Sequence, residues 1–414
     1  MIRHFAALGL FATLTISMAS GLEPTSNWPQ FRGPTGTGTS AESDLPTKWT
    51  PEDVAWQADL PVVGHSSPVI WEDRIFLTGT TSDGNRVSRH VVCLSRKDGS
   101  VQWNEVAATG NGEKLHKMNS WATPSCATDG QRVVAFFGDG GLHCFDVDGK
   151  KLWSRDLGSF PGSWGVGASP VIVGSMVIQN CDATGDSYLL AVDKNTGKDI
   201  WKTPRKSKPK GGWSTPILIE TKAGNQLVVN GEFGVQAYDV KSGKPIWSCD
   251  SFNGRGTPVP AWGNGLLYVV NGKSGDVYAV KPGGKGNVTQ SHMAWHTPRS
   301  GGRDLPSPVF TPEAVVAISM SGIATGYHPE TGKELWKQRV GGNHSGSPMV
   351  AGGLVYAAAE DGTVSVIKAG STSAEIISQN SVGVTSNEIV RSSLAPHNGQ
   401  ILLRSDKRLY CIGK

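Results

Sequence analysis

The stretch LLAVDKNTGKDIWKT, Leu189–Thr203, decides the fold of this chain. Apolar and β-branched residues flank a short Asn-Thr-Gly-Lys segment, which is typical of two antiparallel strands joined by a turn whose glycine has a positive φ. Similar segments recur as DVDGKKLWSRDL from Asp146, DVKSGKPIWSCD from Asp239 and HPETGKELWKQRV from His328. The chain therefore repeats a β-hairpin that ends on a tryptophan-bearing strand.

The tryptophans set the period of this repeat. They align in steps of 41 to 50 residues at Trp56, Trp103, Trp153, Trp201, Trp247, Trp295 and Trp336. A second landmark, Ser/Thr-Pro before an apolar strand, recurs at Pro68, Pro124, Pro170, Pro216, Pro258, Pro308 and Pro348. Strands alone at this period predict a β-propeller with one four-stranded antiparallel blade per repeat.

The two ends of the chain each hold part of an eighth blade. The segment IVRSSLAPHNGQILLRSDKRLYCIGK, from Ile389, has three strands and lacks a fourth, whereas DVAWQADL, from Asp53, is a fourth strand without the first three. Joining them predicts an all-β, eight-bladed propeller closed by an N-terminal strand, with no open edge at the junction. The seventh repeat has Ile376 and Ile377 in place of tryptophan, so we expect that junction to be the loosest. The other tryptophans should pack on the next blade and donate N–H to a backbone carbonyl.

Three segments are predicted along the chain. Residues 1–19 have a cationic start, an apolar run and small residues at Ser17 and Ala19, which indicates a secretory signal peptide. The apolar run is short for a membrane span. Because no cysteine lies near the cleavage site, we do not expect a lipid anchor. Residues 20–48 form an N-terminal extension and 49–414 the propeller. We expect a periplasmic or secreted protein with no membrane span after signal cleavage.

Charge gives little indication of a partner. Lys and Arg number 39 against 35 Asp and Glu, a balance too even to indicate nucleic-acid binding. The basic run KTPRKSKPKGGW, Lys202–Trp213, is interpreted as a solvated loop, and a dock for an anionic polymer is the alternative.

The cysteines are predicted to be structural thiols. Cys93, Cys144 and Cys411 occupy a third-strand position that other blades fill with Ala191, Ala237, Ala279 and Gly326. Such a buried small-residue slot favours free cysteine, although disulfides are the alternative in an exported protein. The state of Cys126, Cys181 and Cys249 is left open.

Function is expected where the loops that enter the innermost strands gather at the channel mouth. Three residues before each opening proline the chain places His65, Trp121, Gly167, Trp213, Arg255, Leu305 and Ser345. A turn needs no such aromatic or cationic residues. We therefore predict a ligand-binding set of His65, Trp121, Trp164, Trp213, Arg255, Arg303, His344 and Arg391. The alternative is that the tryptophans pack the mouth while the arginines pair with Asp304 and Glu388.

These side chains suit a small anionic or sugar-like ligand, or a segment of a protein partner, because tryptophan stacks and arginine offers a planar fork. The sequence contains no HExxH, Gly-x-Ser-x-Gly or phosphate-loop motif. The histidines lack paired metal-ligand spacing, so no metal site is expected. Ser66 and Ser67 follow His65, but a catalytic serine also needs an orienting acid and an oxyanion hole.

The repeat LLAVDKNTGKDIW and the Ser-Pro openings resemble the pyrroloquinoline quinone (PQQ) repeat propellers. The opening NWPQFRGPTGTG, Asn27–Gly38, is similar to the N-terminal signature of exported PQQ-like propeller proteins. The resemblance implies either a PQQ- and calcium-dependent alcohol or sugar dehydrogenase or a non-catalytic scaffold, such as the outer-membrane assembly propeller.

The dehydrogenases that the chain resembles stack the quinone on a tryptophan, hold calcium with acidic and amide side chains, and often cap the site with adjacent cysteines. Trp213, or else Trp121, would be the stacking platform here. The sequence has no adjacent cysteines and no Cys-x-x-Cys-His haem motif, and its entry loops offer only Asp304 and Glu388 as acids. We therefore expect an exported, non-catalytic binding or scaffold module, with a PQQ- and calcium-dependent dehydrogenase as the alternative.

Overall fold

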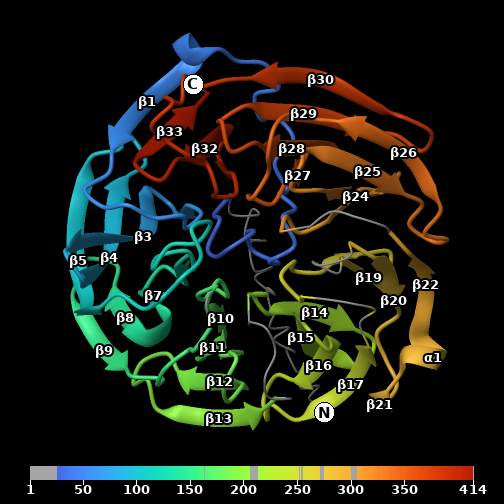
Figure 1. The fold of residues 1–414 in the computed structure, drawn as a ribbon, viewed down its shortest axis with the longest axis horizontal. Coiled ribbons are helices and arrows are strands. Elements are labelled where there is room, and N and C mark those ends of the chain that lie inside the picture. Colours follow the sequence, from blue (N-terminus) through green and yellow to red (C-terminus); the bar gives the residue numbers. More distant parts are fainter. Residues whose placement is uncertain are drawn as a thin grey trace, which may run out of the picture.

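A computed structural model describes residues 26–162, 164–205, 213–250, 252, 255–270, 275–299 and 305–413. These residues form eight β-sheets arranged in a ring (Figure 1), which confirms the all-β, eight-bladed propeller. The signal peptide, Arg303, Asp304 and residues 206–212 of the basic run lie outside the described residues. No helix among the described residues is long and apolar enough to cross a membrane.

Each of the first four blades runs from an innermost to an outermost strand in chain order. Their bounds are, for blade 1, β2 (Val69–Trp71), β3 (Arg74–Asp83), β4 (Arg86–Ser95) and β5 (Val101–Asn111); for blade 2, β6 (Ala127–Thr128), β7 (Arg132–Phe136), β8 (Leu142–Asp146) and β9 (Lys151–Arg155); for blade 3, β10 (Val171–Val173), β11 (Met176–Asn180), β12 (Tyr188–Asp193) and β13 (Asp199–Pro204); and for blade 4, β14 (Ile217–Thr221), β15 (Gly224–Gly231), β16 (Gly234–Asp239) and β17 (Pro245–Asp250).

Blades 5 to 7 follow the same order, and blade 8 takes its outermost strand from the start of the chain. Their bounds are, for blade 5, β18 (Ala261–Gly263), β19 (Leu266–Val270), β20 (Val277–Val280) and β22 (Met293–Thr297); for blade 6, β23 (Val309–Phe310), β24 (Val315–Ile318), β25 (Ile323–Tyr327) and β26 (Glu334–Arg339); for blade 7, β27 (Met349–Ala351), β28 (Leu354–Ala358), β29 (Val364–Ala369) and β30 (Ala374–Asn380); and for blade 8, β31 (Ala395–His397), β32 (Gln400–Arg404), β33 (Arg408–Ile412) and β1 (Val54–Asp59). The short helices are η1 (Pro51–Asp53), η2 (Gly138–Gly140) and α1 (Thr289–His292).

The ring closes as the sequence predicts. β1 pairs antiparallel with β33, and Trp56 lies opposite Cys411. In Figure 1 the blue β1 accordingly lies beside the red β33. The pairing satisfies the outer edge of β33, which would otherwise be open to another chain.

The repeated tryptophans join neighbouring blades. Trp103 donates its Nε1–H to the carbonyl of Val147 in blade 2 at 3.0 Å. Its ring lies against the hairpin glycine Gly149, whose φ is 93°, and a Cβ there would lie 2.9 Å from the ring. Six of the seven tryptophans donate to a carbonyl of the next blade in this way. The exception is Trp247, which donates to the side chain of Gln226.

Blade 5 explains this exception. Its third and fourth strands are joined by a longer connection, in which β21 (Gly286–Asn287) pairs in parallel with β17 and so occupies the place of a short hairpin.

The third-strand slot proves to be the cross-strand partner of the tryptophan. Cys93 lies opposite Trp103, and Gly326 lies opposite Trp336. All six cysteines are buried free thiols, which confirms the prediction for three of them and settles the other three. Burial raises the pKa of the Cys93 thiol to about 12. The thiol therefore stays protonated and acts as a small apolar group.

The structure corrects the expectation of a loose junction after blade 7. There the slot holds Val366, and its cross-strand partner is Ser378. A larger third-strand residue thus faces a smaller fourth-strand residue. The N-terminal segment fills the remaining space, because Trp49 is only 5% exposed and packs in one cluster with Ile377 and residues of blades 7 and 8. The backbone N–H of Trp49 donates to Asn380 Oδ1 at 3.1 Å.

Residues 27–40 cross the centre of the ring as the blue trace in Figure 1. Trp28 bridges to Ile70 in blade 1, and Thr39 bridges to Val350 in blade 7. Arg32, which is 1% exposed, donates to the carbonyl oxygens of Pro308 at 2.8 Å and Pro348 at 3.2 Å. This segment, which we call the plug, therefore ties together the inner ends of separate blades.

Glycines allow the plug to pack this closely. Gly33 has φ 79°, and a Cβ there would lie 2.5 Å from the Trp28 ring. Gly36, at φ 73°, would place a Cβ 2.9 Å from Ile217 of blade 4. L-residues avoid this part of φ space, so both conformation and space require glycine. The Asn27–Gly38 signature is thereby explained as a structural element of the propeller.

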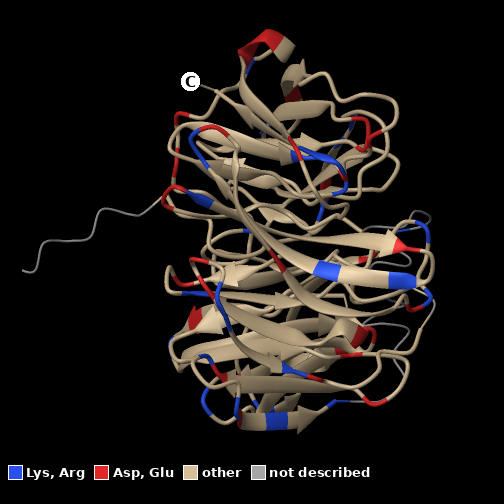
Figure 2. Ribbon diagram, turned by 90° about the vertical axis from the view of Figure 1, so that its left-hand side faces the viewer, with Lys and Arg blue, Asp and Glu red and all other residues tan. Residues whose placement is uncertain are grey.

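Charged residues of both signs are interspersed around the outside of the blades (Figure 2). The surface in this view therefore gives no single-sign field that would draw in a polyelectrolyte. The organised polar features lie instead at the mouth of the channel.

Candidate ligand-binding cavity at the channel mouth

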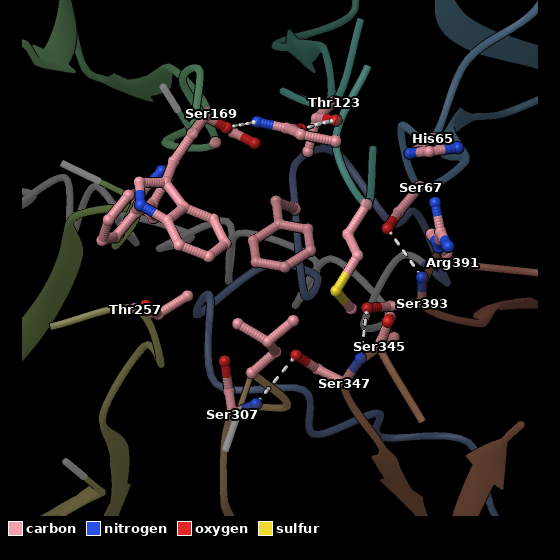
Figure 3. A pocket seen from close by; sticks show the side chains of 18 of the residues that line it. His65, Ser67, Thr123, Ser169, Thr257, Ser307, Ser345, Ser347, Arg391 and Ser393 are labelled. Carbon is pink, nitrogen blue, oxygen red and sulfur yellow. Dashed lines mark hydrogen bonds between the residues drawn. The ribbon is translucent and has the colours of Figure 1, made fainter. Parts of the chain in front are cut away.

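A cavity of about 190 Å³ lies at the channel mouth (Figure 3), and the plug residue Phe31 is part of its lining. Five residues of the predicted set line it. They are His65, Trp164, Trp213, Arg255 and Arg391. The other lining residues are Phe31, Ser67, His116, Met118, Asn119, Thr123, Gly167, Ser169, Thr257, Leu305, Ser307, Met320, Ser345, Gly346, Ser347 and Ser393.

Two predicted residues lie elsewhere. Trp121 turns into a neighbouring cavity and donates its Nε1–H to the carbonyl of Glu113 at 2.9 Å. His344 is 1% exposed, with Nδ1 3.0 Å from the carbonyl of Gly342, and burial lowers its pKa. Arg303 lies outside the described residues. Sequence position therefore located the mouth but not the direction of each side chain.

A stacked layer forms one wall of the cavity. The guanidinium carbon of Arg255 lies 4.5 Å from the centre of the Trp164 ring, a cation–π contact. The ring of His116 stacks on Trp164 at 4.2 Å. Asn119 fixes the backbone here, because its Nδ2 donates to the carbonyl oxygens of Trp164 at 2.6 Å and Val166 at 3.0 Å. His116 and Asn119 come from the loop before blade 2, Trp164 from the loop before blade 3 and Arg255 from the loop before blade 5, so the loops of three blades build this wall.

Trp213 provides a second aromatic surface. Its Nε1–H donates to the carbonyl of Gly165 at 2.8 Å. The side chain also packs against Gly167, where a Cβ would lie 3.2 Å from the indole. Gly167 thus leaves room for the Trp213 ring, which explains why this blade has glycine at the equivalent position.

Arg391 stands on the opposite side, near His65 (Figure 3). Its Nε lies 3.2 Å from Glu360 Oε1, and its Nη1 donates to the carbonyl of Lys117 at 3.2 Å. Ser345 holds the same Glu360 oxygen at 2.5 Å. Two of the three guanidinium nitrogens are thus held by the protein, whereas Nη2 has no hydrogen-bond partner among the described residues.

The alternative, in which the arginines of the mouth pair with Glu388, does not hold for Arg391. Glu388 instead forms an ion pair with Arg408, whose Nη1 lies 3.5 Å from Glu388 Oε1. Glu388 also accepts hydrogen bonds from Ser405 and from Tyr410, at 3.0 Å, within blade 8.

His65 is held as a neutral imidazole. Burial, together with repulsion by Arg391 and the buried Arg404, lowers its pKa to about 3. The side chain therefore offers the cavity one donor and one acceptor at neutral pH, without a charge.

A ring of hydroxyl groups beneath the mouth was missed in the sequence. Ser67 N–H donates to Ser125 Oγ at 2.8 Å, and Ser393 N–H donates to Ser67 Oγ at 2.9 Å. Five more bonds of this kind link successive blades through Ser125, Ser169, Thr215, Val259, Ser307, Ser347 and Ser393. Between blades 4 and 5, Asn230 Nδ2 donates to the carbonyl of Pro258 instead.

The recurring Ser/Thr before proline was the available signal for this ring. Ser67 therefore has a structural role as an acceptor within it. The arrangement around Ser67 does not support its use as a nucleophile.

The described lining does not fit a calcium-bound quinone. Calcium needs several oxygen ligands, usually including carboxylates. The lining residues include no aspartate or glutamate, and the Asn119 oxygen already accepts hydrogen bonds from Ser120 and Thr123. Across the described residues, no group of three or more His, Cys, Asp or Glu side chains could hold a metal ion. Arg255 and Arg391 would also repel a cation.

Comparison with known proteins agrees with the fold. The sequence model of the PQQ_2 family, described as outer membrane protein assembly factor BamB, matches residues 42–181 and 185–413. The chain belongs to this family. The remaining comparisons show how widely its members differ.

BamB of Moranella endobia is 24% identical over 302 residues, which cover 70% of this chain and 71% of that protein. Tetrathionate hydrolase of Acidithiobacillus ferrooxidans is 24% identical over 290 residues, which are 64% of this chain. The match covers 53% of that protein, so this chain spans about half of its length. The quinohemoprotein alcohol dehydrogenase of Comamonas testosteroni superposes with a TM-score of 0.69 at 12% identity, covering 95% of this chain and 82% of that one. That last likeness shows the fold alone.

Proposed function

We propose that this PQQ_2 propeller is an exported, non-catalytic binding module that captures a small organic anion with a planar ring at the channel mouth. The observation that carries the proposal is the cavity itself. It combines two arginines with two indole surfaces and has no carboxylate among its described lining residues. Folding does not need Trp213 or Arg255, because the equivalent positions in other blades hold Gly167, Leu305 and Ser345.

The cavity is suited to binding a ring and a charge together. A planar ring stacks on Trp213 or beside Trp164, and a carboxylate or sulfonate accepts hydrogen bonds from Arg391 Nη2. The neutral His65 adds a hydrogen bond without fixing a charge. These groups are held by backbone contacts, so little ordering is required when the ligand binds.

Support for a binding role also comes from relatives. The match to Moranella BamB, an assembly factor by name, covers similar shares of both chains. Dehydrogenase relatives share the fold, yet the calcium ligands that such an enzyme requires are not found among the described lining residues. The experiment must therefore distinguish a PQQ-dependent dehydrogenase from a protein that only binds its ligand.

The test is a thermal-shift screen followed by titration calorimetry. The panel contains an aromatic carboxylate, an aliphatic dicarboxylate, a neutral sugar, and PQQ with and without calcium. We expect the ring-bearing anions to bind, and Arg391→Gln to weaken them by roughly tenfold to a hundredfold, which is about 1–3 kcal/mol. Arg339→Gln, which removes an arginine outside the cavity, is the matched control.

Two results would contradict the proposal. Binding that is equal in Arg391→Gln and wild type would place the anion elsewhere. Calcium-dependent PQQ binding with dye-linked alcohol oxidation would show an enzyme instead.

A further inference from the structure

Blade 1 is longer than its neighbours. β3 and β4 each have ten residues and β5 has eleven, whereas the matching strands of blade 2 have five each. The innermost strand β2 has only three residues and pairs with the first residues of β3. The far end of β3 therefore extends beyond its inner neighbour, beside the channel mouth.

This extension leaves one residue of the strand edge, Ser82, without a backbone partner among the described residues. Val63 covers the edge at one point, with Val63 N–H donating to Thr80 O at 2.9 Å and Thr80 N–H donating to Val63 O at 2.8 Å. In a strand, the backbone groups of residues i and i+2 point to the same side. The N–H and C=O of Ser82 therefore point toward the side that Val63 covers at Thr80. No described residue pairs with them, and Ser82 is exposed.

A groove of about 660 Å³ runs along this edge. Thr81 and Ser82 form one side, and Val63, Leu115, Trp121 and Ile389 supply an apolar surface. Val63 is 47% exposed, although it lies beside a buried strand. An exposed apolar surface beside a free strand edge is the usual arrangement for strand addition.

The charges of the groove indicate the sign of the occupant. Lys117 and Arg391 line it, and Asp406 is the one acid among the lining residues. The Asp406 carboxylate is engaged, because its Oδ1 accepts the N–H of Ile389 at 2.9 Å. The lining residues thus carry two positive charges against one negative charge. Arg391 is also ion-paired with Glu360, so Lys117 is the cation that an acidic side chain would meet without competition from that carboxylate.

We propose that this groove binds an extended, acidic segment of a partner protein, which adds as a strand to the Ser82 edge of β3. Its backbone pairs with Ser82, its apolar side chains cover Val63 and Ile389, and a carboxylate lies between Lys117 and Arg391. The proposal goes beyond the capture of a small anion in the mouth cavity. Arg391 lines both sites, so the test uses Ser82, which belongs to the groove alone.

The decisive pair of variants is Ser82→Pro and Ser82→Ala. Proline removes the edge N–H and is tolerated where the N–H faces outward, whereas alanine keeps the backbone unchanged. The probe is a displayed library of random peptides of about eight residues, a usual strand length. We expect wild type and Ser82→Ala to retain peptides enriched in acidic residues at alternate positions, and Ser82→Pro to bind them at least roughly tenfold more weakly.

Two further measurements distinguish strand addition from other contacts. Because only the C=O of Ser82 can accept from the peptide, methylating peptide nitrogens one at a time should abolish binding at one position only, and amide exchange should slow at Ser82 on binding. Failure of the library to yield any peptide that wild type retains better than Ser82→Pro would overturn the proposal, as would selected peptides without an acidic preference. Binding of small anions in the mouth cavity should be the same in both variants, so either proposal can fail alone.

Discussion

The plug and the channel mouth use the same kinds of residue for different purposes. At the plug, the guanidinium of Arg32 is 1% exposed and donates to backbone carbonyls of blades 6 and 7. At the mouth, Arg255 and Arg391 lie partly exposed around a cavity, with aromatic rings beside them. Burial lowers the pKa of Arg32 to about 9, so its charge is costly and must be offset by close hydrogen bonds. The comparison teaches that an arginine in this fold can hold blades together or face a ligand, and that its surroundings decide which.

The largest effect is expected from Gly33→Ala in the plug. The added Cβ would lie 2.5 Å from the Trp28 ring, at a φ of 79° that alanine rarely adopts. Strain and overpacking together should lower the free energy of unfolding by about 2–5 kcal/mol. Urea denaturation measures this loss. Gly84→Ala is the control, since its φ of 58° is also positive but no atom lies within 4 Å of the added Cβ. Equal losses in the two variants would show that strain alone matters and that the plug is not tightly packed.

Burial of His65 should lower the stability of the folded protein at acidic pH but not at neutral pH. The folded protein lowers the pKa of His65 to about 3, from an ordinary value near 6.5. Above about pH 6.5 the histidine is neutral in both folded and unfolded chains and affects stability little. As the pH falls from 6.5 toward 3, the unfolded chain takes up the proton first, so stability falls by at most about 1.4 kcal/mol per pH unit.

Replacing His65 measures how much this residue contributes to the loss of stability at low pH. The difference in unfolding free energy between wild type and His65→Gln should change below pH 6.5 in favour of the variant, and stay constant above it. Parallel pH curves for the two proteins would show that His65 is not shielded from solvent as the structure has it. Anion affinity should likewise not rise as the pH falls to 5, because His65 gains no charge there.

At the mouth, truncation should affect binding more than folding. Trp213→Ala removes an indole that lines the cavity and donates a single hydrogen bond, to Gly165. We expect affinity for a ring-bearing anion to fall by about 1–3 kcal/mol, with a smaller change in melting temperature. Trp295→Ala is the contrasting variant, because that tryptophan joins two blades. It should lower the melting temperature strongly and leave the affinity of the folded fraction unchanged. The reverse pattern would make Trp213 a structural residue.

The sequence was sufficient for the fold because each blade repeats the same physical solution. Hairpin glycines, tryptophans and small third-strand residues recur together, and the structure shows them in contact. Blade 7 departed from the expectation for two reasons. Its third strand has the larger residue, Val366, opposite the smaller Ser378 of the fourth strand. Trp49, which lies outside the repeat, packs into the same cluster. Periodicity cannot reveal compensation by a residue that lies outside the period.

The site was predictable only in part for a related reason. The position three residues before the opening proline predicted which residues lie at the channel mouth, because in blades 1 to 7 this position belongs to the loop that enters the innermost strand. The direction of a side chain depends on contacts within each loop. Trp121 turned away because its N–H donates to Glu113 in the long connection from blade 1, and His344 was buried by its own loop. Neither contact has a repeated sequence signal.

The smallest effect is expected within the blades, away from both the plug and the mouth. Cys93 faces neither the plug nor the mouth, and it fills the slot opposite Trp103 that alanine fills in other blades. Cys93→Ala should therefore change the free energy of unfolding by less than about 1 kcal/mol, whereas Cys93→Leu should overpack the slot and cost about 1–3 kcal/mol. Both variants should bind small anions like wild type. Urea denaturation measures the stabilities, and mass spectrometry of the alkylated wild type should find all six thiols free. A disulfide at Cys93, or a leucine variant as stable as wild type, would show that the slot is not the tightly filled position that separates structural from binding regions.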